Sequence, residues 1–285
     1  MRLDEIYKTV KSELKRAGVD SPAFDAICLF EYVFGIDRHG LIMQGQSQAD
    51  PEKIKRLSEL VDRRCSGEPL QYILGKWEFM GRTYEVGSGV LIPREDTCAV
   101  VEAALSAAKK MLKSRDSLKI ADLCSGSGAI AITLAKELPC EVSAVELYDA
   151  AYSYLKRNIE SLNAENVTPV KADVLTCHEN FADSSLDIII SNPPYIKTDE
   201  LKALQREVQK EPREALDGGE DGCFFYRRII KDWSKKLSKN GAVCFELGEG
   251  QYAEIEGLLL EQGYTDIGCV RDMQEIERSI YGFLP

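Results

Sequence analysis

The tetrapeptide Asn192-Pro193-Pro194-Tyr195 follows an apolar run at residues 186–191. That run predicts a buried strand, and open α/β sheets bind ligands beyond the carboxyl ends of their strands. Each proline fixes its own φ and keeps the preceding residue extended, so the Asn192 side chain and the Pro193 carbonyl can present two acceptors to one point. Tyr195 adds a flat apolar face. The motif predicts a clamp for a planar NH2 group whose nitrogen is alkylated; taken alone, a proline-rich turn is an equal alternative.

A glycine loop, Cys-Ser-Gly-Ser-Gly at residues 124–128, lies between a strand-like run and a helical run. Gly126 and Gly128 allow a tight turn and close approach of a ligand, and the helix start behind them offers unpaired N–H groups. Glu146 ends the next predicted strand, where a carboxylate can bind both hydroxyls of a ribose. Because Ala131 completes a Gly-x-Gly-x-x-Ala pattern, a nicotinamide cofactor and S-adenosylmethionine both fit this unit.

Composition limits the class of protein. The chain has 285 residues, of which 44% are hydrophobic, enough for one large or two ordinary packed domains. No apolar run approaches the roughly eighteen residues of a membrane-spanning helix, and residues 1–6 lack the apolar core of a signal peptide. We therefore expect a cytoplasmic protein without membrane association. Nine cysteines without a Cys-x-x-Cys pair and only two histidines predict neither a disulfide framework nor a metal site.

The net charge of −11 disfavours a protein that binds by broad neutralisation of nucleic-acid phosphates. Two local clusters of basic residues, at 109–115 and 231–239, lie near the ends of predicted helices. Basic side chains at helix ends are favoured by the helix dipole and by solvation. We therefore expect no direct binding of nucleic acid.

Periodicity divides the chain into three parts. Residues 1–66 are predicted to form a small helical bundle, with helices that end near Gly18 and begin after Ser21 and Asp50. Residues 67–94 form a predicted linker with a β-hairpin. Residues 95–285 alternate between strand and helix, which predicts an α/β fold with a mainly parallel sheet covered by helices on both faces.

The order of these features resembles the class I S-adenosylmethionine-dependent methyltransferases, which have a Rossmann-like mixed sheet. The glycine loop, Glu146, Asp173 after a third strand and Asn192 after a fourth occur in the order of that class. In isolation Asp173 is better explained as a helix cap or turn residue; in this order the resemblance places it beside the adenine. The cofactor-binding residues implied by the resemblance are Asp122, Cys124, Ser125, Gly126, Gly128, Glu146, Asp173, Val174 and Asn192.

Along its whole length the chain resembles the bacterial release factor glutamine methyltransferases. The segments that carry this resemblance are residues 68–75, 90–94, 192–196, 211–219 and 245–248, together with the glycine loop. The family methylates the amide nitrogen of the glutamine in the Gly-Gly-Gln loop of peptide chain release factors, with S-adenosylhomocysteine as the second product. The resemblance also implies that the N-terminal helical domain helps to hold the protein substrate and that the last strands form an antiparallel hairpin. We expect the protein to act as a monomer.

Two departures from the family pattern affect residue-level transfer. Glu95 and Cys98 stand where the family has a proline and a glutamate, and Cys124 occupies a position that is glycine in many methyltransferase loops. We expect the loop to tolerate a residue with a Cβ. Two roles remain possible for Glu211: it shapes a lid behind the tetrapeptide, or it is a surface charge.

The implied mechanism assigns catalysis to Asn192, Pro193 and Tyr195. The Asn192 side-chain oxygen and the Pro193 carbonyl would each accept one N–H of the glutamine, and Tyr195 would pack against the amide plane. The motif contains no obvious general base. Three alternatives remain: a glutamine methyltransferase of a ribosomal protein, an adenine amino-methyltransferase acting on nucleic acid, and a catalytically silent binding partner of translation factors.

Overall fold

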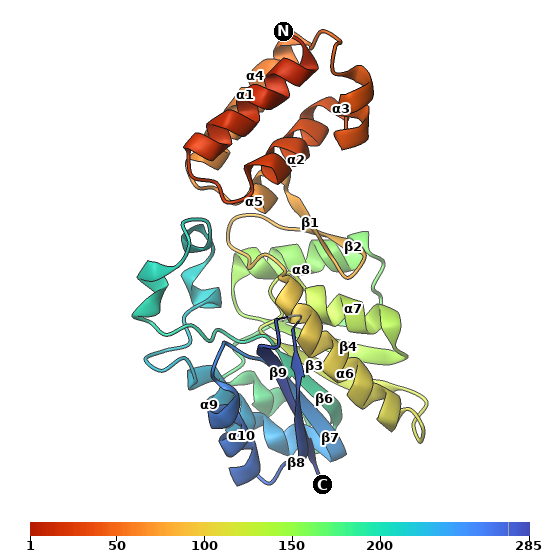
Figure 1. Ribbon diagram of the computed structural model, residues 1–285. Helices are drawn as coiled ribbons and strands as arrows, with labels where there is room; N and C mark the ends of the chain where they lie inside the picture. The colour runs from red at the N-terminus through yellow and green to blue at the C-terminus, as the bar shows by residue number, and fades with distance from the viewer. Residues whose placement is uncertain (273) are drawn as a thin grey trace. The chain divides into compact units, whose positions relative to one another are not determined.

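The computed structural model describes residues 1–272 and 274–285, which form two compact units (Figure 1). The first unit comprises Met1–Lys76 and Gln205–Lys210, and the second comprises Trp77–Leu204 and Glu211–Pro285. The chain therefore passes from one unit to the other three times. The short segment Gln205–Lys210 belongs to the first unit although its flanking residues belong to the second.

The first unit is helical, as its periodicity predicted. Its α-helices are α1 (Leu3–Arg16), α2 (Pro22–Phe34), α3 (Arg38–Gln44), α4 (Pro51–Cys65) and α5 (Leu70–Leu74), and Gln205–Lys210 adds the 3-10 turn η4 (Val208–Lys210). Four apolar residues of α1 are buried: Leu3, Ile6, Val10 and Leu14. Their spacing places them on one face of the helix, which packs against α2 and α4.

The ends of these helices follow local chemistry. Asp50 accepts a hydrogen bond from the Glu52 N–H at 2.9 Å, and a proline occupies the first turn of α4. Gly18 follows α1 with φ of 80°, a conformation that glycine adopts without strain. The predicted starts at Ser21 and Asp50 are confirmed. The short helices α3 and α5 were not predicted, because neither is long enough to show a periodic pattern.

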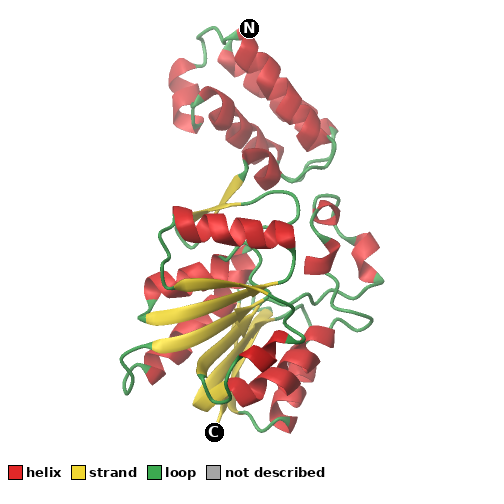
Figure 2. Ribbon diagram, turned by 180° about the vertical axis from the view of Figure 1, so that it is seen from behind, coloured by secondary structure: helices red, strands yellow, loops and turns green. Residues whose placement is uncertain are grey.

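The second unit contains a two-stranded sheet and a seven-stranded sheet. The hairpin is formed by β1 (Lys76–Phe79) and β2 (Arg82–Glu85). The large sheet has the order β5-β4-β3-β6-β7-β9-β8, in which β9 is antiparallel to both of its neighbours and the other pairs are parallel. Figure 2 shows its strands in yellow with helices beside them. Its strands are β3 (Leu118–Leu123), β4 (Cys140–Glu146), β5 (Val167–Lys171), β6 (Leu186–Ser191), β7 (Leu237–Glu246), β8 (Thr265–Arg271) and β9 (Glu277–Leu284). This topology confirms the predicted α/β class and the antiparallel last hairpin.

Helices cover both faces of the large sheet (Figure 1). They are α6 (Cys98–Met111), α7 (Ala129–Glu137), α8 (Asp149–Ser161), α9 (Phe224–Trp233) and α10 (Tyr252–Glu261). Ile188 and Ile190 of β6 belong to a hydrophobic cluster with α6, α7 and α8, whereas Ile189 between them belongs to a cluster with α9 and α10. Alternation of this kind is what a strand buried on both faces requires.

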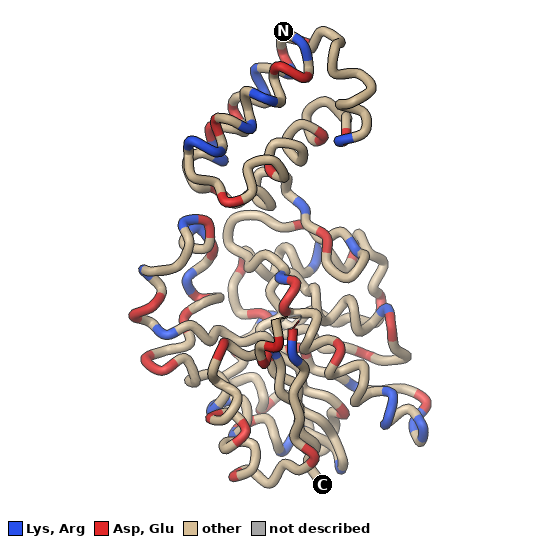
Figure 3. Tube along the Cα trace, viewed as in Figure 1, with Lys and Arg blue, Asp and Glu red and all other residues tan. Residues whose placement is uncertain are grey.

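Short 3-10 turns connect several of these elements. They are η1 (Glu95–Thr97), η2 (Cys177–Asn180), η3 (Glu200–Ala203), η5 (Arg213–Ala215) and η6 (Ser234–Lys236). Within the described residues, no helix is both long and apolar enough to cross a membrane. Lys and Arg alternate with Asp and Glu along much of the chain (Figure 3).

Candidate active site

A cavity of about 240 Å³ lies at the carboxyl ends of the parallel strands. Its walls come from the loops that follow β3, β4, β5 and β6, and from the segments around residues 89–97 and 212–215. Strand order reverses between β3 and β6, because the chain first builds outward to β5 and then returns to the other side of β3. Doubly wound folds bind ligands at such a switch point. The fold therefore brings the predicted motifs to one place.

Most of the predicted site residues line this cavity. Those in the lining are Cys124, Ser125, Gly126, Glu146, Asp173, Val174, Asn192 and Pro194. The other four are not part of the lining: Gly128, Pro193 and Tyr195 lie next to lining residues in the sequence, and Asp122 lies two residues before Cys124. Asp122 is fully buried at the end of β3, and Tyr195 directs its hydroxyl to a buried carboxylate.

The glycine loop has the backbone that its composition predicted. Gly126 and Gly128 have φ of 54° and 83°, and a Cβ at Gly128 would lie 2.5 Å from the Leu155 side chain. A Cβ at Gly126 would meet only Val90, at 4.0 Å, so this glycine leaves open space within the cavity. Cys124 has φ of 63°. The loop accommodates its Cβ in the left-handed region, which for such a residue is strained by about 1–2 kcal/mol.

Glu146 closes the loop against the following turn. One carboxylate oxygen accepts the Gly126 N–H at 2.9 Å, and the other accepts the Tyr148 N–H at 2.8 Å. Burial raises the pKa of Glu146, while these hydrogen bonds act in the opposite direction. Since a carboxylate has about four acceptor positions, further acceptor capacity remains on Glu146, which lines the cavity.

Two aspartates were also predicted to bind the cofactor, Asp122 and Asp173. Asp122 Oδ2 accepts the Ala131 N–H at 3.1 Å, and burial raises the pKa of this carboxyl to about 7. Its Oδ1 is buried without a hydrogen-bond partner among the described residues. Asp173 accepts the Leu175 N–H at 2.8 Å, which is the turn role considered from the sequence, and it also lines the cavity. The role of Asp173 in the turn is therefore compatible with a second role in the cavity.

The Asn192 side chain is oriented by Thr97. Asn192 Nδ2 donates to Thr97 Oγ1 at 3.3 Å, and both residues line the cavity. Because the amide nitrogen is used in this contact, the Asn192 oxygen points the other way. An acceptor in that position is what the predicted NH2 clamp requires.

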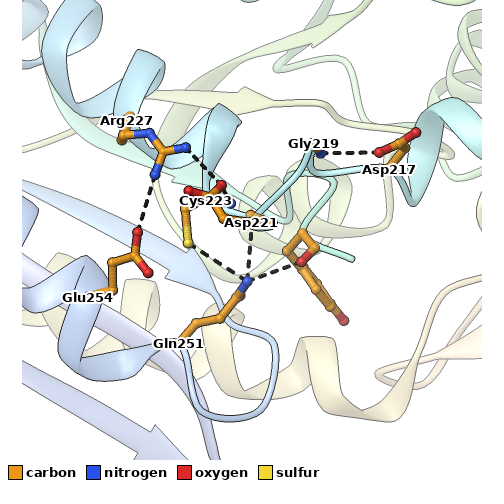
Figure 4. Close-up of polar contacts among 9 residues, drawn as sticks. Asp217, Gly219, Asp221, Cys223, Arg227, Gln251 and Glu254 are labelled. Atoms are coloured by element: carbon orange, nitrogen blue, oxygen red, sulfur yellow. Dashed lines mark hydrogen bonds and ion pairs between the residues drawn. The ribbon is translucent and has the colours of Figure 1, made fainter. Parts of the chain in front are cut away.

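Gln251 braces the backbone behind the tetrapeptide (Figure 4). Its Nε2 donates to the Tyr195 carbonyl at 3.1 Å and to the Gly222 carbonyl at 3.3 Å, and its Oε1 accepts the Gly248 N–H at 2.9 Å. Close packing adds to this brace, since a Cβ at Gly222 would lie 2.4 Å from the Tyr195 oxygen. Three loops are thereby held together, and the end of the motif has little freedom to move.

Glu211 is not a surface charge, and that alternative from the sequence is wrong. It is only 6% exposed, its Oε2 accepts the Ile92 N–H at 3.0 Å, and its Oε1 pairs with Arg94. Burial raises its pKa, and the nearby Arg94 acts against this rise. Glu211 thus holds the cavity segment around Arg94.

Sequence reasoning missed three residues of this region as site residues: Thr97, Glu246 and Gln251. Glu246 stood in a segment that carried the family resemblance, and Thr97 lies shortly after another, yet no role followed from their types. A buried carboxylate at the end of a strand was the available signal, since Glu246 directly follows the apolar run of β7. Gln251 had no such signal, because its partners come from other loops.

A doubly wound sheet with an antiparallel last strand and a cavity over a glycine loop is the fold of the class I methyltransferases. Two solved structures support this fold. The catalytic domain of hMettl16 bound to hairpin 6 of the MAT2A 3'UTR has a TM-score of 0.53 and 14% identity, and the match covers 79% of this chain and 91% of that chain. The same domain bound to hairpin 1 has a TM-score of 0.51 and 16% identity, and the match covers 88% of each chain. At this identity the likeness shows the fold alone.

Residues 5–75 match the model of the PrmC N-terminal domain, and residues 102–242 match that of the methyltransferase small domain. The release factor glutamine methyltransferase of Clostridium botulinum is 36% identical, over 94% of this chain and 94% of its own length. That of Geobacter sulfurreducens is 39% identical, over 98% and 95%. The chain belongs to the family of release factor glutamine methyltransferases, which confirms the family predicted from its motifs.

Proposed function

We propose that this protein transfers a methyl group from S-adenosylmethionine to the side-chain amide nitrogen of the glutamine in the Gly-Gly-Gln motif of peptide chain release factors. The observation that carries the proposal is the orientation of Asn192 at the cavity. Its amide nitrogen is bound to Thr97, so its oxygen is available to a substrate NH2 group. Relatives that match nearly the whole chain bear the corresponding name.

The cavity residues suit the cofactor. Glu146 has acceptor capacity for ribose hydroxyls, Asp173 and Val174 line the wall assigned to the adenine, and Gly126 leaves room at the loop. We assign these residues, with Asp122, Cys124, Ser125, Gly128 and Asn192, to binding of the cofactor. When bound, S-adenosylmethionine supplies an electrophilic methyl group. What the chain must add is the position and electron density of the nitrogen that receives it.

A carboxamide nitrogen is a weak nucleophile because its lone pair is delocalised into the carbonyl group. Asn192 Oδ1 and the Pro193 carbonyl would each accept one N–H of the glutamine, and these bonds would increase electron density on nitrogen while fixing its direction. Pro194 keeps the clamp rigid, and Tyr195 would pack beside the amide plane. The clamp contains no general base, and the amide proton would leave to water once the nitrogen carries the methyl group.

The remaining assignments extend this proposal. The first unit, Met1–Lys76 with Gln205–Lys210, would help to hold the release factor, and residues 67–94 would connect it to the methyltransferase sheet of residues 95–285. We propose that the protein acts as a monomer in the cytoplasm, where release factors work. We also propose that it does not bind nucleic acid directly, because its net charge is −11.

The test is mass spectrometry of the tryptic Gly-Gly-Gln peptide from an unmodified release factor incubated with the protein and S-adenosylmethionine. The expected result is a gain of one methyl group on the glutamine. An unmodified peptide, with cofactor binding confirmed by calorimetry, would contradict the proposal and favour a ribosomal protein or an adenine base as the substrate. A protein that binds both partners without transfer would be the silent binding module.

A further inference from the structure

Glu246 is a buried carboxylate at the end of β7 that the proposed mechanism does not use. It is 1% exposed, and within the described part of the chain it forms no ion pair with a lysine or arginine. Its Oε2 has no hydrogen-bond partner among residues 1–272 and 274–285. A buried carboxylate without a cation lowers the stability of the fold. A role of Glu246 in the neighbouring site would explain why a glutamate occupies this position.

The contacts of Glu246 lead to both ends of the tetrapeptide. The Tyr195 hydroxyl donates to Glu246 Oε1 at 3.3 Å. Burial raises the pKa of Glu246, and a hydrogen bond from the Thr97 hydroxyl to the carboxylate acts against that rise. Thr97 Oγ1 also accepts a hydrogen bond from Asn192 Nδ2 at 3.3 Å. Glu246 is thus connected directly to Tyr195 and through one hydroxyl to Asn192.

The direction of these hydrogen bonds follows from the number of protons. A hydroxyl has one proton, and an ionised carboxylate can only accept. When Glu246 is ionised, Thr97 donates its proton to Glu246 and faces Asn192 with a lone pair. The Asn192 group that contacts Thr97 must then be the NH2, so Oδ1 is directed away from Thr97.

We propose that ionised Glu246 is a positioning residue that, through Thr97, holds the Asn192 amide with its oxygen toward the substrate and anchors Tyr195 at the other end of the motif. This inference rests on the proposed function, because it concerns how the clamp for the glutamine amide is oriented. It adds a residue that does not touch the substrate and a protonation state that the clamp requires.

The proposal has a pH consequence. Burial raises the pKa of Glu246 to about 7. As the pH falls through this value, Glu246 becomes a donor, and Thr97 is no longer obliged to donate toward it. The Asn192 amide then loses its preferred direction, so kcat should fall on the acid side. The titratable and charged groups that act on Glu246 or respond to it are Asp96, Cys98, Tyr195, Tyr226 and Arg278.

The first test follows the Asn192 side-chain amide directly by ¹⁵N-edited NMR, with Asn192→Asp used to assign the signal pair. In the wild-type protein the pair should shift between pH 6 and 8 with a midpoint near 7. Glu246→Gln and Thr97→Val should abolish this titration. A pair that does not titrate in the wild-type protein, or that titrates equally in Glu246→Gln, would overturn the inference.

The second test measures methyl transfer to a release factor. Glu246→Gln should lower kcat at pH 8 at least tenfold, leave the KM and the cofactor Kd within about twofold, and remove the acid limb of the pH profile. Thr97→Val should lower kcat similarly, and Thr97→Ser, which restores the hydroxyl, should recover most of that loss. Glu246→Gln with a wild-type kcat and an unchanged acid limb would contradict the proposal.

Asp187→Asn is the matched control. Asp187 is also a buried carboxylate of the large sheet, but it lies at the opposite end of β6, where it accepts the Lys119 N–H and the Ser238 hydroxyl and pairs with Arg115. This variant should keep the wild-type kcat and acid limb. The NMR and kinetic tests also separate two failures. If the Asn192 amide titrates but the release factor is not methylated, the proposed function is contradicted. If the release factor is methylated and Glu246→Gln has no effect, only the positioning role is contradicted.

Discussion

The ion cluster of the first unit and the Glu246 site of the second unit bury carboxylates in different ways. In the first unit the buried Arg64 donates to Asp25 at 2.6 Å and to Glu207 at 2.8 Å. Burial raises the pKa of Asp25, and Arg64 acts against that rise. In the second unit Glu246 has hydrogen bonds from hydroxyls, one oxygen without a partner in the described chain, and a pKa of about 7.

The difference separates a structural role from a functional one. A buried charge with a cation and several hydrogen bonds is compensated, and removal of its partner is strongly destabilising. A buried carboxylate without that compensation lowers stability and keeps a pKa near neutrality, which is typical of groups at functional sites. Mutations in the two regions should therefore separate stability from activity.

The largest effect is expected for Arg64→Met in the first unit. The variant leaves Asp25 buried without its cation, so the free energy of opening of α1, α2 and α4 should fall by about 3–5 kcal/mol. Amide hydrogen exchange measures this quantity locally, which matters in a protein of two units. Arg63→Met is the control, because the Arg63–Glu68 pair is largely exposed and should contribute at most about 1 kcal/mol. Equal losses in the two variants would remove the contrast.

Asn192→Ala should lower activity strongly and stability only slightly. Loss of one acceptor from the clamp is expected to reduce kcat by about 10²–10³-fold, by analogy with the removal of a single hydrogen-bonding group from other transition-state binding sites. The free energy of unfolding should change by no more than about 1.5 kcal/mol, because one neutral hydrogen bond to Thr97 is lost. Kinetics and urea denaturation of the same preparation measure both. A wild-type kcat would refute the assigned role of Asn192.

Gly222→Ala tests the packing behind the tetrapeptide. Gly222 has φ of 77°, and a Cβ would lie 2.4 Å from the Tyr195 carbonyl oxygen, so both strain and displacement are expected. The variant should lose about 2–3 kcal/mol of stability and part of its kcat. Gly250→Ala separates the two causes, because Gly250 has φ of 80° with nothing within 4 Å of the Cβ position. It should lose only the strain, about 1 kcal/mol, with kcat retained.

The smallest effect is a gain in stability from Glu246→Gln. The folded-state pKa of Glu246 is raised from 4.5 to about 7, so the wild-type protein loses stability as the pH rises through this interval. The variant should match the wild type below pH 4.5 and exceed it by about 1–3 kcal/mol above pH 7. Urea denaturation at pH 5 and pH 8 measures the change. Glu207→Gln is the contrast. Burial acts to raise the pKa of Glu207, but its hydrogen bond with Arg64 makes the net shift downward, so this variant should lose stability at pH 8. A gain there would break the comparison.

The sequence predicted local elements of secondary structure better than it predicted contacts between distant segments. The strand at 186–191 begins and ends in the structure where the sequence placed it, because it is a short apolar run with turn residues beside it. The start of α4 followed from Asp50 and the proline after it. The inclusion of Gln205–Lys210 in the first unit was not predicted, because Arg206 contacts the Cys65 and Ser66 carbonyls from a position about 140 residues away.

Motifs that depend on neighbouring residues could be predicted from the chain: the proposed Asn-Pro-Pro-Tyr clamp, the glycine loop and the acidic residue at the end of β4 are each local combinations of residue type and spacing. Their meeting at one cavity, and the partners that orient them, depended on the tertiary fold. Thr97 and Asn192 are separated by 95 residues, and Tyr195 and Glu246 by 51. The direction of an amide and the ionisation of a buried carboxylate depend on such distant partners and on exclusion of water, and neither is encoded in local periodicity.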